Sequence, residues 1–446
     1  MRVQTFVALA VVAGLGAIAL PASAQEVTYA RDVAPIIQNK CQECHTENSI
    51  APFTLDNYDQ VVRRARMIRR AVDERVMPPW HINPTIGIQH FKNNRGLTPD
   101  ERQTVLAWID AGTPMGDPAD LPAPREPVDY TQWQMADQFG EPDLVVTSEP
   151  YTLEAVTQDK WFRPVVPTGL TEERWVRAIE IKPSFPGGRR IVHHALAFLI
   201  QDESKATTLA SSGGADAAAS MGGELFMEWA VGKVGEIFPE DGGKLMLPGS
   251  AIMFEEHLHA VGEKVENATV SLGVWFYPKG YVPENRTRLT MFDVRGDTDI
   301  DIPPNEVAVT QDYHVIQQPS RFENFQPHMH MRGKAMKLEA IYPDGHKEVI
   351  SVVDNFQWRW HNNYVYEDGY QPLFPVGTTL VLTAWHDNTA ENPNNPDPEQ
   401  WVGYGDRTVD EMAHLWVDVT VLSQEEFDRE WAARQQRMNA GGGQQQ

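Results

Sequence analysis

The 446-residue chain has little cysteine, few long apolar runs and a deficit of positive charge. Its two cysteines both stand in Cys41-Gln-Glu-Cys44-His45, so none remains to build a disulfide framework. After the first 24 residues there is no run of about 18 uncharged apolar residues, which argues against a membrane span. Lys and Arg number 38 and Asp and Glu 62, giving a net charge of −24, so we expect no nucleic-acid partner.

Residues 1–24 have the pattern of a secretory signal peptide. Arg2 provides a positive start, Phe6 to Leu20 is apolar, and Ala22-Ser23-Ala24 is an A-x-A cleavage site. Gln25 follows the cleavage site instead of cysteine, which argues against a lipid anchor. We therefore expect a periplasmic or secreted protein. The mature chain of about 420 residues is too long for one core, so it should have two or three domains.

The cysteine motif has the C-x-x-C-H pattern of covalent haem c attachment. In that chemistry Cys41 and Cys44 form thioethers to the haem, and His45 is the proximal iron ligand. A chance match and a thiol redox pair are the alternatives. Helix-like spacing over Ala30 to Lys40 and a capping box at Thr98 flank the motif. Residues 25–118 thus resemble a small all-α class I cytochrome c domain with one haem.

Such a haem needs a sixth iron ligand, and Met77 is the expected one. Pro78 holds Met77 in an extended segment, and a thioether ligand suits an electron carrier. Met67, His81 and His90 are the rival ligands. With His45 and Met77 both bound, the iron would transfer electrons and leave no position for oxygen.

The chain changes character after a Pro- and Asp-rich linker at 119–139. Short β-prone runs then alternate with turns, which predicts two all-β antiparallel jelly-roll or sandwich domains at 140–303 and 304–425. Residues 203–223 are expected to be a flexible insertion, and 426–446 a partly disordered tail. The clearest runs are Ile191 to Ile200, Thr269 to Tyr277, Ala308 to Ile316, Ala335 to Tyr342, Thr378 to Trp385 and Ala413 to Val421.

Three close histidine pairs and one methionine stand out in this β-rich part. Imidazole together with thioether is the ligand set of a copper ion that cycles between Cu(I) and Cu(II). In a strand, the side chains of His328 and His330 point to the same face, so both can reach one metal. Neighbours such as His193 and His194 can share a metal only at a bulge or at the strand's end. The set consists of His193-His194, His257-x-His259, His328-x-His330 and Met412.

The spacing of these residues resembles the copper type II, ascorbate-dependent monooxygenase family. This family includes the peptidylglycine α-hydroxylating and dopamine β-monooxygenases. The resemblance covers roughly residues 140–425. It rests on Val192-His193-His194, on Glu256-His257-Leu258-His259-Ala-Val-Gly262, on Gln326-Pro-His328-Met-His330-Met-Arg-Gly333-Lys334, and on Asp410-Glu411-Met412.

The resemblance implies two copper ions with different ligands and roles. An electron-storing copper would take His193, His194 and His257, and an oxygen-activating copper would take His328, His330 and Met412. His259 is left with an outer-shell role or none. Each turnover would use O₂ and two electrons to hydroxylate a C–H bond. The electrons come through the fused haem, or ascorbate or a redox protein reduces the copper directly.

Departures from the family point to a different substrate. Gln326 stands where the peptide enzyme has the arginine that anchors the substrate carboxylate, and His414 and Trp416 stand where it has an asparagine and a tyrosine. We therefore expect a small organic substrate in place of a peptide. His414 either hydrogen-bonds the substrate or oxygen as a catalytic residue, or is structural. Four further histidines are expected to be structural: His314, His346, His361 and His386.

Two classes of function remain open from these residues. The leading hypothesis is an exported haem–dicopper monooxygenase. The alternative is a non-catalytic electron-transfer or copper-binding protein with the same ligands, and a degenerate family member lacking one copper is a third possibility. Three protein ligands per copper leave a coordination position open, which favours catalysis.

Overall fold

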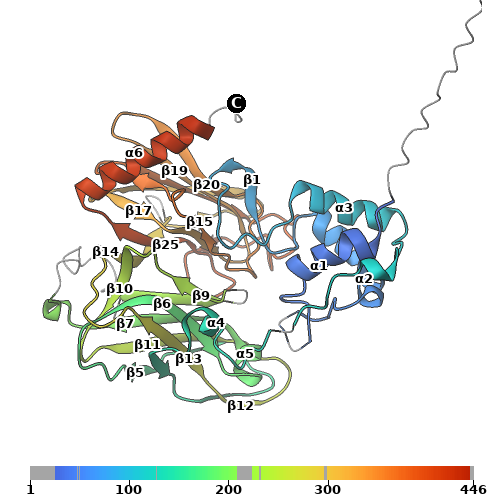
Figure 1. Cartoon of the computed structure of the whole chain (residues 1–446), viewed down its shortest axis with the longest axis horizontal. Helices are drawn as coiled ribbons and strands as arrows, with labels where there is room; N and C mark the ends of the chain where they lie inside the picture. The colour runs from blue at the N-terminus through green and yellow to red at the C-terminus, as the bar shows by residue number, and fades with distance from the viewer. Residues whose placement is uncertain are drawn as a thin grey trace, which may run out of the picture.

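The computed structural model describes residues 26–441 except 48, 50, 127, 208–223, 231–232 and 296–298. It consists mostly of β-sheet, with a helical region set to one side (Figure 1). The predicted signal peptide and most of the predicted flexible insertion lie outside the described residues. Among the residues described, no helix is long and apolar enough to cross a membrane.

The helical region comprises η1 (Tyr29–Val33), α1 (Ala34–Lys40), α2 (Tyr58–Asp73) and α3 (Pro99–Asp110). Val33, Val61 and Trp108 meet in its small apolar core. The predicted capping box is confirmed, because Thr98 Oγ1 accepts a 3.1 Å hydrogen bond from the Glu101 amide and the Glu101 carboxylate accepts one of 2.8 Å from the Thr98 amide.

One segment of this region belongs to a distant sheet. β1 (Ile82–Gly87) pairs antiparallel with β20 (Lys347–Val353), and Phe91 forms a bridge to Tyr366. Trp80 packs edge-on against Tyr364 at 4.6 Å between ring centroids. Residues 80–91 therefore connect the helical region to the second half of the chain. The local sequence pattern did not predict this long-range pairing.

The first β region is an antiparallel sandwich. Side chains from its two layers share one core, with Ile179 and Val274 on one side and Phe254 and Trp229 on the other. One layer has the order β4-β11-β7-β8 with β5, and the other is β2-β13-β6-β10. Their bounds are β2 (Leu144–Thr147), β4 (Lys160–Phe162), β5 (Val165–Pro167), β6 (Arg174–Pro183), β7 (Val192–Ile200), β8 (Glu224–Ala230), β10 (Gly242–Met246), β11 (Ala251–Leu258) and β13 (Val270–Phe276).

The second β region packs a sheet of order β1-β20-β19-β23-β16 against strands that centre on β25. β14 pairs with β25 over seven positions, and with β10 in a short parallel contact that joins the two regions. By strand pairing this region therefore begins with β14, ahead of the expected boundary at 303–304. The bounds are β14 (Asn285–Asp293), β16 (Val307–Val315), β17 (Ser320–Phe322), β18 (Asn324–Met329), β19 (Gly333–Ile341), β23 (Thr379–Asp387) and β25 (Ala413–Val421).

All six predicted strands are confirmed to within two residues at each end, as β7, β13, β16, β19, β23 and β25. The remaining short elements connect or flank these sheets. They are η2 (Pro118–Asp120), α4 (Ala136–Phe139), β3 (Tyr151–Leu153), α5 (Gly187–Ile191), η3 (Glu203–Lys205), β9 (Gly235–Ile237), β12 (Val265–Ala268), β15 (Asp301–Ile302), β21 (Tyr364–Val365), β22 (Leu373–Phe374) and β24 (Val402–Gly403).

The described part of the C-terminal tail is a helix, which the sequence pattern did not predict. α6 (Gln424–Gly441) buries Phe427 against Leu373 and Leu422. Arg434 also donates a 2.6 Å hydrogen bond to Glu348. The apolar residues of α6 thus have a partner that sequence composition could not show. Residues 442–446 lie outside the described part.

Candidate metal centre

The first cluster joins three histidines on two neighbouring strands. His194 of β7 lies opposite His257 of β11, so both side chains leave the same face of the sheet. The register then shifts, because Leu258 pairs with Val192 and leaves His193 as an extra residue. Of the two arrangements that the sequence left open, a bulge or the strand's end, the structure shows a bulge. It places the Nδ1 atoms of His193 and His194 3.2 Å apart, and the three histidines offer nitrogens within 4.8 Å of one another.

Asp159 orients this cluster from outside, and sequence reasoning missed it. Its carboxylate lies 2.9 Å from His257 Nε2 and 2.9 Å from His259 Nδ1. Trp161 stacks on His257 with 4.5 Å between ring centroids. His257 Nδ1 is buried and has no hydrogen-bond partner among the described residues. An Nε2–H held by a carboxylate and an unpartnered Nδ1 is the arrangement of a metal-binding histidine.

Burial keeps the imidazoles of the first cluster neutral. Burial first, and then the neighbouring His257, lower the pKa of His193 to about 4. Burial and nearby histidines, first among them His361, also lower the pKa of His194 well below 6.5. Since only the neutral ring offers a lone pair to a metal, no proton has to be displaced near pH 7.

The second cluster is a row of side chains on a two-strand ladder. β18 and β25 pair antiparallel, with Gln326 opposite Trp416 and His328 opposite His414. His330 lies one residue beyond β18, and Met412 one residue before β25. The strand pairing ends at Met329 and Ala413, and just past it the ring of His330 lies 5.3 Å from that of His328, centroid to centroid. Because alternate residues and cross-strand partners share a face, Gln326, His328, His414 and Trp416 leave the same side of the ladder.

The Asp410-Glu411-Met412 segment is anchored to the histidine strand. The Asp410 carbonyl lies 3.1 Å from His330 Nδ1, which leaves Nε2 of that ring for a metal. The Glu411 carboxylate accepts hydrogen bonds from the backbone amides of His330 (3.1 Å) and Arg332 (2.7 Å). Burial raises the pKa of Glu411 to about 8. The segment that presents Met412 is thereby fixed beside His330.

Two other residues of the row have definite partners. Trp416 stacks on His328 with 4.9 Å between ring centroids and an interplanar angle of 10°. His414 Nε2 lies 2.9 Å from Asp293 Oδ1, on β14. His414 therefore faces the same side as His328 while an acidic residue holds its ring.

A loop histidine stands between the two clusters, and sequence reasoning assigned it only a structural role. His361 is 7% exposed, and its ring centroid lies 4.7 Å from that of His328 and 5.5 Å from that of His194. It follows Trp358 and Trp360 in a loop without a metal-ligand pattern. No local signal distinguishes it from a packed aromatic segment.

The C-x-x-C-H residues lie just after α1. The backbone amide of His45 donates a 2.9 Å hydrogen bond to the Cys41 carbonyl, which folds the motif into a turn. His45 Nδ1 lies 3.0 Å from the Phe53 carbonyl, so Nε2 is left for iron. Both cysteines are free thiols that are not engaged in a disulfide.

The rivals to Met77 as the sixth ligand are occupied or point elsewhere. His81 donates from Nε2 to the Val76 carbonyl at 3.2 Å and accepts at Nδ1 from Asn362, also at 3.2 Å. His90 stacks on Tyr370 at 3.6 Å. Met67 lies on α2 and is 52% exposed. Met77, the expected sixth ligand, is half-buried and lies beyond the end of α2.

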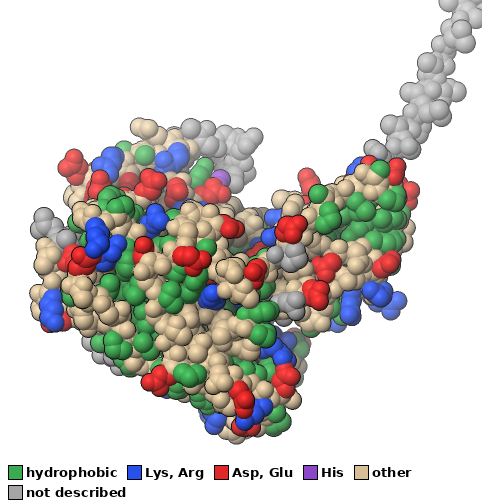
Figure 2. Space-filling view, turned by 60° about the horizontal axis from the view of Figure 1, so that its bottom comes forward, with side chains coloured by type: hydrophobic (Ala, Val, Ile, Leu, Met, Phe, Trp, Pro, Cys, Tyr) green, Lys and Arg blue, Asp and Glu red, His purple; other side chains and the backbone are tan. Residues whose placement is uncertain are grey.

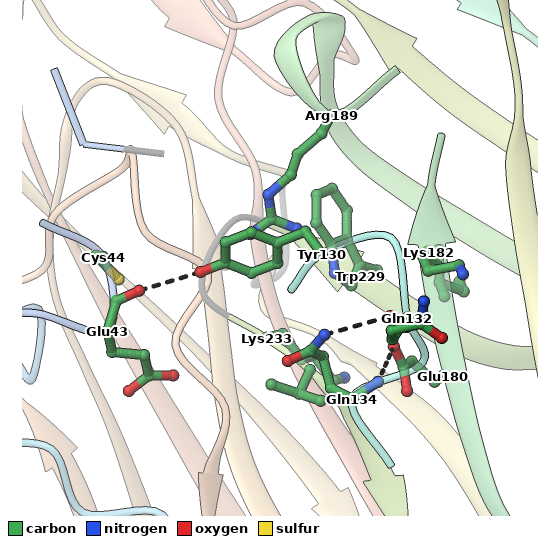
Figure 3. A pocket seen from close by; sticks show the side chains of 12 residues that line it. Glu43, Cys44, Tyr130, Gln132, Gln134, Glu180, Lys182, Arg189, Trp229 and Lys233 are labelled. Carbon is green, nitrogen blue, oxygen red and sulfur yellow. Dashed lines mark hydrogen bonds between the residues drawn. The ribbon is translucent and has the colours of Figure 1, made fainter. Parts of the chain in front are cut away.

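A small pocket lies where the C-x-x-C-H loop meets the first β region (Figure 3). Its volume is about 40 Å³, and its wall includes Cys44, Tyr130, Arg189, Trp229 and Lys233. Figure 3 shows Tyr130 between this loop and Arg189, whose guanidinium carbon lies 3.7 Å from the centre of the Tyr130 ring. The C-x-x-C-H loop thus lies next to the sandwich that carries the first cluster.

On the face drawn in Figure 2, acidic and basic side chains are mixed, and almost no histidine is visible. This agrees with the burial of His257, His328 and His361.

No family model matches this chain, and no curated protein matches it. Solved structures with some similarity include the VP2 subviral particle of infectious bursal disease virus, at 12% identity over 67% of this chain and 74% of that one, with a TM-score of 0.17. The coconut allergen cocosin is 9% identical over 64% of this chain and 85% of that one, with a TM-score of 0.13. At such TM-scores, function has to be argued from the site alone.

Proposed function

We propose that this chain is an exported, periplasmic or secreted, copper-dependent monooxygenase. It would hydroxylate a C–H bond of a small organic substrate with O₂, using two copper ions and one haem c. The observation that carries the proposal is the pair of unequal clusters. One offers three converging imidazoles, and the other sets His328 and His330 beside the segment that carries Met412, on the adjoining β region.

The residues present fit copper at both places. Imidazole nitrogens suit Cu(II), and a thioether shifts the preference toward Cu(I), so the two sites favour different steps of one redox cycle. When bound, copper supplies O₂ activation and electron storage. The overall reaction is R–H + O₂ + 2e⁻ + 2H⁺ → R–OH + H₂O.

The protein side chains orient and shield the second site. Asp410 holds His330, Trp416 covers His328, and Glu411 fixes the segment before Met412. These residues are buried or half-buried, which limits access of bulk water to the reacting groups. Each site has three proposed protein ligands, and this leaves one position open.

The surroundings of the second site favour a neutral or aromatic substrate. Gln326 donates to the buried carboxylate of Glu228 and is not free to hold a substrate carboxylate. Trp416 presents an aromatic face in the same row. His414, held by Asp293, is the polar group best placed to meet the substrate.

Haem c would be held by Cys41, Cys44, His45 and Met77 in a cytochrome c-like domain. The proposal that it relays electrons to the first copper is supported by the pocket wall, in which Cys44 and Trp229 both take part. Trp229 of β8 is the neighbour of Ala230, which pairs with His194. Direct reduction by ascorbate or a redox protein is the competing route, and the variants below separate the two.

The test uses the full chain with haem, loaded with copper and reduced, under ¹⁸O₂ with a panel of small C–H substrates. We expect ¹⁸O-labelled alcohol and O₂-dependent haem reoxidation, both lost in His328→Ala. If His328→Ala leaves product and reoxidation unchanged, the monooxygenase proposal fails. For the relay, Cys41→Ala/Cys44→Ala protein should lose turnover with a protein donor but keep it with ascorbate. Full turnover with both donors would exclude the relay.

A further inference from the structure

His361 occupies a place that neither proposed ligand set explains. It lies in the loop 354–363 between β20 and β21, and its ring contacts His328 on one side and His194 on the other. Among the described residues, it is the one histidine outside the two ligand sets whose ring contacts both of them. This position suggests that His361 acts on the ligand histidines.

In two of the proposed ligand histidines, a protein group contacts the ring nitrogen that would face away from the metal. His257 has Asp159 at its Nε2, and His330 has the Asp410 carbonyl at its Nδ1. The nitrogen that faces the metal is thereby decided by a partner on the other nitrogen. For His328, the partner that lies at Nδ1 is His361, with 3.3 Å between the two Nδ1 atoms.

We propose that His361 is the positioning residue of the second copper site. Its Nδ1 accepts the hydrogen bond from His328 Nδ1–H, so that His328 presents Nε2 to copper. This inference rests on the proposed function, because it takes His328 as a copper ligand. It assigns His361 the proton on Nε2 and an unprotonated Nδ1.

A buried carboxylate of the first β region lies beside His361. Glu228 Oε1 of β8 lies 3.8 Å from His361 Nδ1. Glu228 is fully buried, accepts a hydrogen bond from Gln326, and has Lys233 Nζ at 3.5 Å. The contacts from Glu228 thus join β8 of one region to β18 and the His361 loop of the other. The second site would depend on side chains of both β regions.

Three substitutions at His361 separate positioning from packing. His361→Phe keeps a planar ring and removes the acceptor, and His361→Ala removes both. His361→Gln restores a side-chain oxygen that accepts a hydrogen bond. Trp358→Phe is the matched control, because Trp358 lies in the same loop and contacts His193, at 6.5 Å, on the first-cluster side.

The measurements are copper content, affinity for Cu(I) in competition with a chelator, and the EPR spectrum of the Cu(II) protein. Loss of an outer-shell partner typically weakens metal affinity by about 10–100-fold. We expect that loss at the second site in the Phe and Ala variants, with an altered second-site EPR signal. His361→Gln should recover most of the affinity. The first site should be unchanged in all variants, which also shows that each variant is folded.

The outcomes distinguish this inference from the proposed function. Suppose that wild-type protein binds two coppers and that the second site is unchanged in both His361→Phe and His361→Ala. This result would overturn the role of His361 and leave the proposed function standing. Equal losses in the Gln and Phe variants would also overturn it, since packing alone would then explain them. A wild-type chain that binds no copper at His328 would overturn the function itself.

Discussion

The first cluster gathers three imidazoles at a strand bulge, whereas the second sets two imidazoles beside a separate segment that carries a methionine. In the first, register and bulge bring the nitrogen atoms of His193, His194 and His257 together. In the second, the rings of His328 and His330 lie 5.3 Å apart, and the 3.1 Å contact between His330 Nδ1 and the Asp410 carbonyl holds the segment before Met412 beside them. The bulge makes the first cluster compact, and the second cluster draws on two separate segments.

This difference matches the division of labour that the ligands favour. An all-imidazole site with a carboxylate behind His257 stabilises a fixed geometry, which suits storage of an electron. A site with two imidazoles and a thioether favours Cu(I), the state that reacts with O₂, and His414 and Trp416 lie on the strand beside His328. Three predictions test whether the two sites differ in this way, and a fourth tests the junction that joins the helical region to the second β region.

The largest effect is expected from removing one ligand of each site. His194→Ala should leave one copper per chain, at the second site, and His328→Ala should leave one at the first. Product formation should fall in both by at least about 100-fold, more than is typical for loss of an outer-shell partner. Copper analysis and EPR of the two variants check this. Loss of both coppers in either variant would contradict two independent sites.

A smaller effect is expected from Met412→Leu. Because Leu and Met have similar volumes, the swap should cost less than about 1.5 kcal/mol of stability. Loss of the thioether should lower second-site Cu(I) affinity and product formation roughly 10-fold or more, with the first site unchanged. Met331→Leu, one residue beyond His330, is the control and should alter neither site. Equal behaviour of the two variants would remove Met412 from the ligand set.

Asp159→Asn tests the first site separately from the second. Without the carboxylate at His257 Nε2, first-site copper affinity should fall by about 10–100-fold while the second site keeps its affinity. His259→Ala is the matched control, because it removes the other partner of Asp159, an exposed histidine. The control should have a smaller effect. A similar loss at both sites in Asp159→Asn would mean that the sites are not independent.

The smallest effect concerns the junction between the helical region and the second β region. Burial lowers the pKa of His81 to about 4 from an ordinary 6.5. Between these values the unfolded chain binds the proton more tightly, so stability is present above about pH 6.5 and is lost as pH falls. From about pH 7.5 to 5.5 the loss due to His81 should be about 1 kcal/mol.

His81→Gln should remove that part of the pH dependence and leave both copper sites intact. Urea unfolding of the haem- and copper-loaded protein at the two pH values gives the measurement. The same pH dependence in wild-type and variant protein would show that His81 is not kept neutral at the junction.

The regular parts of the fold follow from local sequence pattern. Alternation and turn residues predicted β7 and β25 closely, and the capping box at Thr98 predicted α3. The pairing of β1 with β20 and of β14 with β25 did not follow, because strand partners far apart in sequence leave no local trace. α6 was missed although Phe427 and Trp431 have helical spacing, because its packing partners lie elsewhere in the chain.

The residues of the candidate site were also predictable only in part. The histidine pairs and Met412 carry recognisable spacing, and the need for a bulge at His193 follows from strand geometry. Asp159 and His361 carry none, because a single acidic or aromatic-flanked residue becomes a site partner only through tertiary contact. Outer-shell residues are therefore the part of the site that required the structure.

The most direct test of two unequal copper sites is a crystal structure of the copper-loaded protein with anomalous diffraction at the copper edge. We predict two separate peaks in each chain, one among His193, His194 and His257 and one beside His328, His330 and Met412. A single peak shared by His194, His361 and His328, or no peak at either cluster, would contradict the account.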